Sequence, residues 1–182
     1  ARRVVRHKCV ICTSRNSLKS KNSQTCGPIT YFARKMIDLN DHNVFMRAAL
    51  AEAEAAAIDG EVPVGAVVVA GGRIIARAHN LTERLTDVTA HAEIQAITAA
   101  SNYLGSKYLS KCTLYVTLEP CPMCAGALFW SQMGSVVYGA SDDKRGFRDH
   151  GGDLHPKTEL IKGIMKEECG QIMTDFFSNR RK

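Results

Sequence analysis

Two short stretches of the sequence carry residue types that could hold and use a metal ion. His91 and Glu93 lie two residues apart in "TAHAEIQAI", at the expected start of a helix, and Cys121 and Cys124 lie three apart directly after a proline. Two cysteines at i and i+3 of a first helical turn can point both sulfurs at one ion, and a helix N-terminus favours thiolates. One histidine and two cysteines form a three-ligand zinc set that leaves the fourth tetrahedral position for water, as catalytic sites do.

Glu93 is expected to transfer protons rather than to bind the metal. Residues i and i+2 of a helix point about 200° apart, so His91 and Glu93 can address one pocket only where the chain is still entering the helix. A carboxylate beside a zinc-activated water can take its proton and carry it to a substrate. The order H-x-E followed by P-C-x-x-C is the pattern of the zinc nucleobase deaminases, and it arises by chance in well under roughly one in a thousand chains.

Plainer interpretations of these residues remain open. His91 and the two cysteines could form a structural zinc site, although such sites usually have four protein ligands and the sequence offers no evident fourth. Glu93 could instead be a buried residue that caps the helix. Glu119, which lies in the same stretch as the cysteines, is interpreted as supporting the backbone or the ligands rather than as a second catalytic acid.

Longer stretches extend the match over most of the chain. From about residue 41 to the C-terminus the sequence resembles the bacterial tRNA-specific adenosine deaminase family, in the stretches "EVPVGAVVV", "HNLTERLTDVTAHAE", "TLYVTLEPCPMCAGAL", "VVYGASDDKRG" and "FFSNRR". The resemblance implies a cytidine-deaminase-like fold, a homodimer, and conversion of the wobble adenosine of a tRNA anticodon to inosine. Because such enzymes act on an unstacked base, a looped single strand is an easier substrate than a duplex.

The resemblance also assigns roles to individual residues at the metal. His91, Cys121 and Cys124 would bind one zinc ion per subunit. Glu93 would shuttle the proton during the hydrolytic reaction that releases ammonia. These are the residues that the spacing alone singles out.

Three further residues would contact the substrate according to the same resemblance. Asn80 would hydrogen-bond the flipped-out base, and Asp142 and Lys144 would lie near the anticodon stem-loop. Each has a plainer interpretation, because an asparagine that ends a strand often belongs to a turn and a charged loop is often only solvated. The chain departs from the family at Val88, where proline commonly stands, and this change is expected to loosen the loop that enters the site.

The elements that must position these residues follow from periodicity and turn signals. The pattern predicts a helix over 40–60, a hairpin over 64–80, a helix over 91–104, a strand over 112–119, a helix over 121–133, a strand over 134–140, and two helices after 157. Strands that alternate with helices after a hairpin predict a three-layer α/β/α fold with a central mixed sheet of about five strands, in keeping with the cytidine-deaminase-like fold of the resemblance. The expected domains are a basic, disordered N-terminal extension over 1–39 and a zinc-dependent deaminase domain over 40–182.

The net charge of +6 is concentrated in that extension. Residues 1–40 hold nine of the 24 Lys and Arg residues but one of the 18 Asp and Glu residues, so the remainder of the chain is slightly acidic. An argument for a polyanionic partner therefore depends on the site and on local patches. The extension is interpreted as sequence upstream of a natural start at Met36, with an organellar transit segment as the alternative.

Composition favours a cytoplasmic protein that is not attached to a membrane. No apolar run approaches the roughly 18 residues that span a bilayer, and the first residues are too polar for a secretory signal peptide. Seven cysteines form an odd number without the dense spacing of a disulfide scaffold, which favours a reducing compartment. A zinc knuckle built on Cys9 and Cys12 is disfavoured because the spacing of its further ligands is loose.

The sequence thus predicts a zinc-dependent tRNA adenosine deaminase, and two alternatives stay open. The same metal centre with a smaller pocket would deaminate a free base or nucleoside of the guanine or cytosine type. A non-catalytic RNA-binding relative would keep the fold but would be free to lose Glu93, which is present. The "DDKRG" loop and the terminal "FFSNRR" favour RNA over a free base.

Overall fold

The computed structural model describes residues 42–180. Its elements, in chain order, are α1 (His42–Ile58), β1 (Gly65–Ala70), β2 (Arg73–His79), α2 (Ala92–Leu104), β3 (Cys112–Leu118), α3 (Pro122–Trp130), β4 (Ser135–Ala140), α4 (Phe147–His150), β5 (Glu159–Lys162) and α5 (Lys166–Arg180). The predictions for the N-terminal extension, including the zinc knuckle and the start at Met36, lie outside the described residues. No helix in the described part of the chain is long and apolar enough to cross a membrane.

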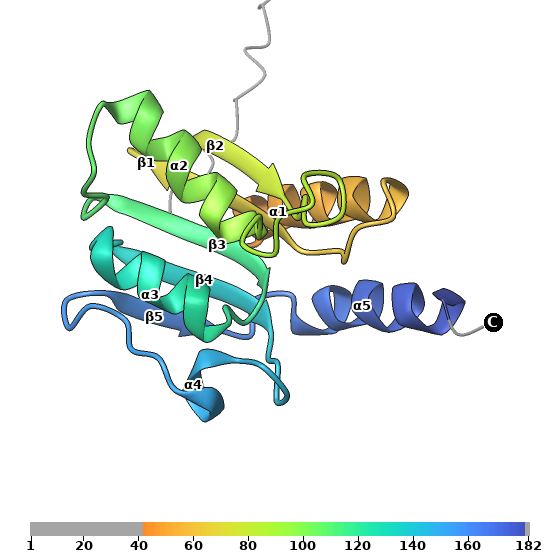
Figure 1. Cartoon of the computed structure of the whole chain (residues 1–182). Coiled ribbons are helices and arrows are strands. Elements are labelled where there is room, and N and C mark those ends of the chain that lie inside the picture. The colour runs from red at the N-terminus through yellow and green to blue at the C-terminus, as the bar shows by residue number, and fades with distance from the viewer. Residues whose placement is uncertain (1–41, 181–182) are drawn as a thin grey trace, which may run out of the picture. The chain divides into compact units, whose positions relative to one another are not determined.

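Five strands form one mixed sheet in the order β2-β1-β3-β4-β5 (Figure 1). β1 pairs antiparallel with β2 and with β3, whereas β3 and β4, and β4 and β5, pair in parallel. The opening hairpin closes through Gly71 and Gly72, which both adopt positive φ (54° and 73°), as a two-residue turn of this kind requires. The prediction of a mixed sheet of about five strands is confirmed.

Helices cover both faces of this sheet (Figure 1). α2 and α3 lie on one face, where Leu128 of α3 packs with Leu114 of β3. α1 and α5 lie on the other face, where Met46 and Cys169 pack with Tyr115. Adjacent residues of β3 thus point to opposite faces, as the period of a strand requires. The three-layer α/β/α prediction is confirmed.

The prediction for the tail after residue 157 is wrong in its first half. Residues 159–162 form β5 rather than a helix, and β5 pairs in parallel with β4 at the edge of the sheet. Four residues are too few to show a period, and the neighbouring strand supplies the backbone hydrogen bonds that decide the outcome. The helix expected over 121–133 ends at Trp130, and α4 forms between residues 140 and 157, where no helix or strand is predicted. The other predicted elements are confirmed, with ends shifted by a residue or two.

The topology brings three chain segments to one edge of the sheet. β2 and β3 point the same way because each is antiparallel to β1 between them, and Leu118 at the end of β3 lies opposite Ala140 at the end of β4. The chain therefore leaves β2, β3 and β4 at the same edge, and α2 and α3 begin there. This carboxyl edge is where open α/β sheets bind their ligands.

Candidate metal and substrate site

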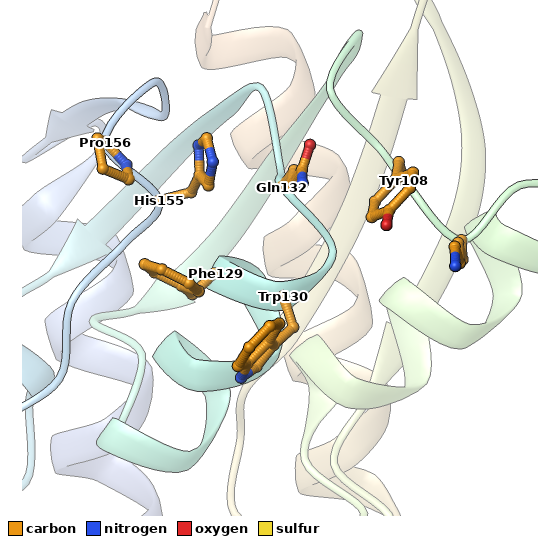
Figure 2. A pocket seen from close by; sticks show the side chains of 7 residues that line it. Tyr108, Phe129, Trp130, Gln132, His155 and Pro156 are labelled. Atoms are coloured by element: carbon orange, nitrogen blue, oxygen red, sulfur yellow. The ribbon is translucent and has the colours of Figure 1, made fainter.

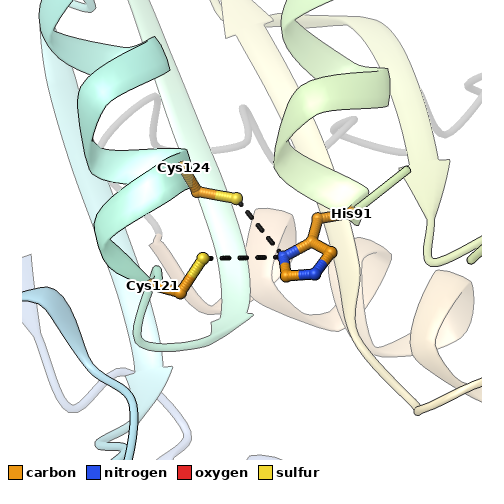
Figure 3. Close-up of side chains that lie close together, drawn as sticks. All are labelled: His91, Cys121 and Cys124. Atoms are coloured by element: carbon orange, nitrogen blue, oxygen red, sulfur yellow. Dashed lines mark hydrogen bonds between the residues drawn. The ribbon is translucent and has the colours of Figure 1, made fainter. Parts of the chain in front are cut away.

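Three side chains at this edge could hold a metal ion (Figure 3). The Nδ1 atom of His91 lies 3.7 Å from the Sγ atom of Cys121 and 3.5 Å from the Sγ atom of Cys124. All three ligand atoms lie within 4.8 Å of one another. The structure thus brings together the three residues that the sequence spacing singled out, from segments that lie about 30 residues apart in the chain.

The starts of two helices position these ligands. His91 is the N-cap residue of α2 and Cys121 is the N-cap residue of α3, both with extended backbone (ψ 154° and 169°), and Cys124 lies in the first turn of α3. Neither N-cap side chain bonds to its own helix, so both turn toward the group they share. Pro122 occupies the first turn of α3, where a missing N–H costs nothing.

The cysteine pair offers negative charge to a cation. A hydrogen bond from the Cys124 thiol, together with the neighbouring His91, lowers the pKa of Cys121 to about 4 against the opposing effect of burial. The same thiol–thiolate hydrogen bond and burial raise the pKa of Cys124, so Cys121 loses its proton first. The hydrogen bond to Cys121 also raises the pKa of His91. A thiolate at the positive end of a helix dipole is a strong ligand for a soft or borderline metal ion.

Glu93 is the buried acid of the site. It lies in the first turn of α2, its exposed fraction is 3%, and the Cys124 thiol contacts its carboxylate. Burial raises the pKa of Glu93, against the lowering effect of its own backbone N–H and of His91. Because His91 precedes the helix while Glu93 lies within it, both side chains reach the Cys124 thiol despite their spacing of two.

Asn80 ties the end of β2 to the start of α2. Its Oδ1 atom accepts a hydrogen bond of 3.2 Å from the N–H of Ala92, the first residue of the helix that carries Glu93. Its own N–H donates to the carbonyl of Val64 over 3.1 Å. The side chain is buried, and within residues 42–180 its Nδ2 group has no hydrogen-bond partner. A donor at the edge of the site is therefore left for another molecule.

Asp142 and Lys144 lie in the loop that follows β4 at the same edge. The Oδ1 atom of Asp142 accepts hydrogen bonds from the N–H groups of Lys144 and Arg145 (3.0 and 3.1 Å), so the aspartate organises the loop itself. The side chain of Lys144 is exposed. The charge of Arg145 acts on the pKa of His91, which places the loop beside the metal-ligand group. The RNA contacts of Asp142 and Lys144 stay a prediction.

Two buried glutamates hold the loops beside the site. Glu119 accepts hydrogen bonds from the N–H groups of Asp142 (3.4 Å) and Arg148 (3.3 Å), in keeping with its interpretation as a backbone support. Glu61, which the sequence analysis missed, accepts hydrogen bonds from the loop after β2. The only sequence signal for Glu61 is an acid directly before an apolar run, and such acids are usually exposed.

Two hollows of the surface lie away from the metal-ligand group. The first, of about 570 Å³, is lined by Tyr108, Phe129, Trp130 and their neighbours (Figure 2). The second, of about 550 Å³, shares Tyr108. No metal-ligand candidate lines either hollow. Trp130 lies at the opposite end of α3 from Cys121, so these hollows belong to a different surface.

The terminal helix α5 is largely exposed. Within this helix Cys169 is buried, whereas Phe177 is 41% exposed. The guanidinium of Arg180 stacks over the ring of Phe176 at 4.9 Å and donates a hydrogen bond to the carbonyl of Gly60. The helix end is thereby fixed next to the residue that precedes Glu61.

Known sequences place the described domain in one family. A family model of MafB19-like deaminases matches residues 40–181. The tRNA-specific adenosine deaminase of Bacillus subtilis is 44% identical over 150 residues, which span 79% of this chain and 93% of that protein. The chloroplastic tRNA(adenine(34)) deaminase of Arabidopsis thaliana is 44% identical over 159 residues, which span 75% of this chain and 12% of that longer protein.

Solved structures agree in fold. A structure from a study of A-to-I editing by tRNA:A34 deaminases matches with a TM-score of 0.66 at 43% identity, over 71% of this chain and 98% of the other. A guanine deaminase from Nitrosomonas europaea matches with a TM-score of 0.65 at 25% identity, over 75% of this chain and 85% of the other. The backbone is equally similar to both, whereas the sequence is closer to the tRNA deaminases. The chain therefore belongs to the MafB19-like deaminases and, within them, to the tRNA-specific adenosine deaminase family.

Proposed function

We propose that this protein is a zinc-dependent enzyme that converts adenosine to inosine at the wobble position of a tRNA anticodon, with release of ammonia. The observation that carries this function is the meeting of a three-ligand group with the buried carboxylate of Glu93 at the carboxyl edge of the sheet. A relative named tRNA-specific adenosine deaminase matches this chain at 44% identity over 93% of the relative's own length, which supports the choice of substrate.

The ligand group has the spacing that zinc needs. With Zn–N of about 2.0 Å and Zn–S of about 2.3 Å, a nitrogen and a sulfur ligand of a tetrahedral site stand about 3.5 Å apart. The two distances from His91 Nδ1, 3.5 and 3.7 Å, agree with this value. Zinc bound by His91, Cys121 and Cys124 would supply a water molecule that loses a proton near neutral pH.

Glu93 moves the protons of the reaction. Its carboxylate accepts a proton from the water that attacks C6 of adenine and delivers this proton to N1 of the base. The same carboxylate then carries the proton of the hydroxyl group added at C6 to the amine, so that the C6–N bond breaks, ammonia leaves and the base becomes hypoxanthine. The burial of Glu93 keeps bulk water out of the path between these atoms.

Asn80 orients the base through its free Nδ2 donor. Because Oδ1 is committed to the N–H of Ala92, an acceptor on the purine is the group that Asn80 can recognise. Asn80→Asp keeps an oxygen for Ala92 but replaces the donor with a second acceptor. We expect this variant to raise KM for an anticodon stem-loop about tenfold, with a smaller change in kcat. Steady-state kinetics at constant zinc content measure it, and an unchanged KM would contradict the assigned contact.

One comparison of substrates tests the function. The purified full-length chain is incubated with tRNA, with free guanine, with cytidine and with adenosine, and inosine in tRNA and released ammonia are measured. We expect inosine at position 34 of the tRNA and no turnover of the small molecules. Turnover of guanine or cytidine without reaction of tRNA would show that the protein is a deaminase of free bases or nucleosides, as the structural likeness to a guanine deaminase allows.

We further propose that the protein is a homodimer and that Trp130 lies in the interface. Trp130 is 78% exposed at the end of α3, beside the hollow in Figure 2, and a large exposed aromatic next to other apolar groups is typical of an interface. Trp130→Glu should convert the dimer to a monomer in sedimentation velocity at micromolar concentration. Ile58→Glu, at an equally exposed position on α1, should leave the dimer intact. A monomeric wild-type protein would overturn this proposal.

The location in the cell remains the sequence-based prediction of the cytoplasm. The similar proteins include bacterial enzymes and one whose name places it in the chloroplast. Imaging the full chain fused to a fluorescent protein distinguishes the cytoplasm from an organelle.

A further inference from the structure

Glu61 lies between α1 and β1, and its side chain is completely buried. Its Oε1 atom accepts hydrogen bonds from the N–H groups of Glu83 (3.0 Å) and Arg84 (2.9 Å). Its Oε2 atom accepts a hydrogen bond from the hydroxyl of Thr82 (3.0 Å) and a second, longer one from the N–H of Glu83 (3.2 Å). One carboxylate thus binds three consecutive residues of a loop more than 20 positions further along the chain.

The hydrogen bonds of the buried carboxylate favour its ionised form. Burial alone would raise the pKa of Glu61, but the hydrogen bonds from Arg84, Glu83 and Thr82 outweigh it, and the net pKa is lowered. The charge is not balanced by a cation, because the ion pairs within 42–180 do not include Glu61 and the Arg84 guanidinium lies near Asp59 at 3.7 Å. Burying a charge costs desolvation energy, and hydrogen bonds from backbone N–H groups offset this cost. These bonds stabilise the conformation of the loop that supplies the N–H groups.

That loop, residues 81–88, connects Asn80 to the segment that carries the metal-ligand candidate His91. It begins directly after Asn80 and leads to His91, and the N–H of Leu81 donates to the carbonyl of Ala90 (3.0 Å), which closes the base of the loop. The side chains of residues 83–89 are exposed, so the tip of the loop has little core contact of its own. A segment with few buried contacts keeps one shape only if polar groups fix it.

Glu119 gives the loop on the other side of the site the same kind of support. It is buried, and it accepts hydrogen bonds from two N–H groups of residues 142–148. A Cβ atom at Gly146 would lie 2.6 Å from the Glu119 carboxylate, so this loop passes too close for any other residue. Each of the two loops is therefore fixed by one buried carboxylate: Glu61 holds the loop after β2, and Glu119 holds the loop after β4.

We propose that Glu61 is a positioning residue for substrate binding: it holds the 81–88 loop in the shape that receives the anticodon loop beside the metal site. This inference rests on the proposed function, and it extends that function to a residue that touches neither the metal ligands nor the base. The exposed side chains of the loop, such as Arg84, Leu85 and Val88, are then presented to RNA in a fixed arrangement.

Glu61→Gln is the direct test, because glutamine keeps the shape but removes the negative charge and one of the two acceptor oxygens that the loop binds. We expect KM for an anticodon stem-loop to rise about tenfold, the effect of losing one hydrogen bond to a charged acceptor, while kcat changes less than about threefold. Zinc content should stay at one per chain. Hydrogen exchange at the amides of Glu83 and Arg84 should become at least about tenfold faster, and this measurement requires no activity.

Matched variants separate this role from a general loss of stability. Glu54→Gln changes an exposed acid of α1 and should behave as wild type. Thr82→Val removes one donor to Glu61 and should raise KM about threefold, whereas Thr82→Ser keeps the hydroxyl and should not. In the double variant, the effects of Thr82→Val and Glu61→Gln on KM should not be additive, because both substitutions act on the same contact. If Glu61→Gln fails to fold, the Thr82 pair still carries the test.

The outcomes that overturn the inference are distinct from a failure of the proposed function. Faster amide exchange with unchanged KM would show that Glu61 supports the loop without any part in substrate binding. Equal losses of kcat and zinc would show that it acts on the metal centre instead. If the wild-type protein does not deaminate tRNA at all, the proposed function falls, and the exchange data still decide whether Glu61 holds the loop.

Discussion

Glu93→Gln is expected to lower kcat by a factor of about 10³ or more while the protein keeps its metal ion. Proton transfer by a positioned group contributes about 10²–10⁴ to a rate, and Glu93 would serve both the attacking water and the leaving amine. The amide of glutamine has nearly the same volume but cannot accept and return a proton. Because Glu93 is not among the three ligand atoms that lie within 4.8 Å of one another, zinc binding should survive.

Single-turnover kinetics with an anticodon stem-loop, with zinc measured in the same samples, check this expectation. Glu54→Gln removes an exposed carboxylate elsewhere and controls for the change in net charge. Binding of the stem-loop by the Glu93 variant should be close to that of wild type, since the substituted group acts after the base has entered the site. Wild-type turnover by Glu93→Gln would remove the carboxylate from the mechanism and favour the capping interpretation of this residue.

The metal-ligand candidates could be predicted from the sequence because the constraints on their spacing are local. Cys121 and Cys124 lie on one helical turn, and His91 stands two residues before Glu93, so spacing alone tells which residue types meet. Spacing cannot show that the pair His91 and Glu93 lies close in space to the pair Cys121 and Cys124. That proximity follows from topology, because β2 and β3 point the same way and deliver both helices to one edge of the sheet.

The loop supports could not be predicted in the same way. Glu61 is separated from Thr82 by 21 positions, and its partners are mainly backbone N–H groups, which leave no trace in the sequence. Asn80 was singled out by resemblance, but its bond to the N–H of Ala92 appears only in the structure and determines which end of the amide faces outward. The strand β5 escaped prediction for a related reason, because pairing with β4 decides the conformation of four residues.

Val88 shows how structure modifies an expectation taken from a family pattern. The loss of proline at this position is expected to loosen the loop, yet Val88 is 83% exposed and the neighbouring Asp87 binds both the N–H and the hydroxyl of Thr89 (2.8 and 2.7 Å). Together with the hydrogen bonds to Glu61, this contact fixes both ends of the loop by polar groups. Conformational restriction that proline would supply through its ring can also be supplied by such bonds.

Cys124→Ser is expected to abolish metal binding, and with it deamination, to below about one part in 10³ of the wild-type rate. A serine hydroxyl stays protonated where a thiol near zinc becomes a thiolate, so the site would keep two of its three ligands. Because a metal bound only by the folded protein stabilises it, Tm should also fall, by at least about 5 °C. Cys112→Ala, at the start of β3 and at the opposite edge of the sheet, should retain both zinc and activity.

Removal and return of the metal separate ligation from folding. Wild-type protein treated with a zinc chelator should lose activity and regain it when zinc is added, whereas Cys124→Ser should regain none at any zinc concentration that the wild type tolerates. Circular dichroism at 25 °C should show the same secondary structure for both apo proteins, because the core on each face of the sheet is built without the ligands His91 and Cys121. Full activity of the chelated wild type would disprove the ligand set. One zinc per chain in Cys124→Ser would disprove it as well, because only His91 and Cys121 of the three ligands would remain.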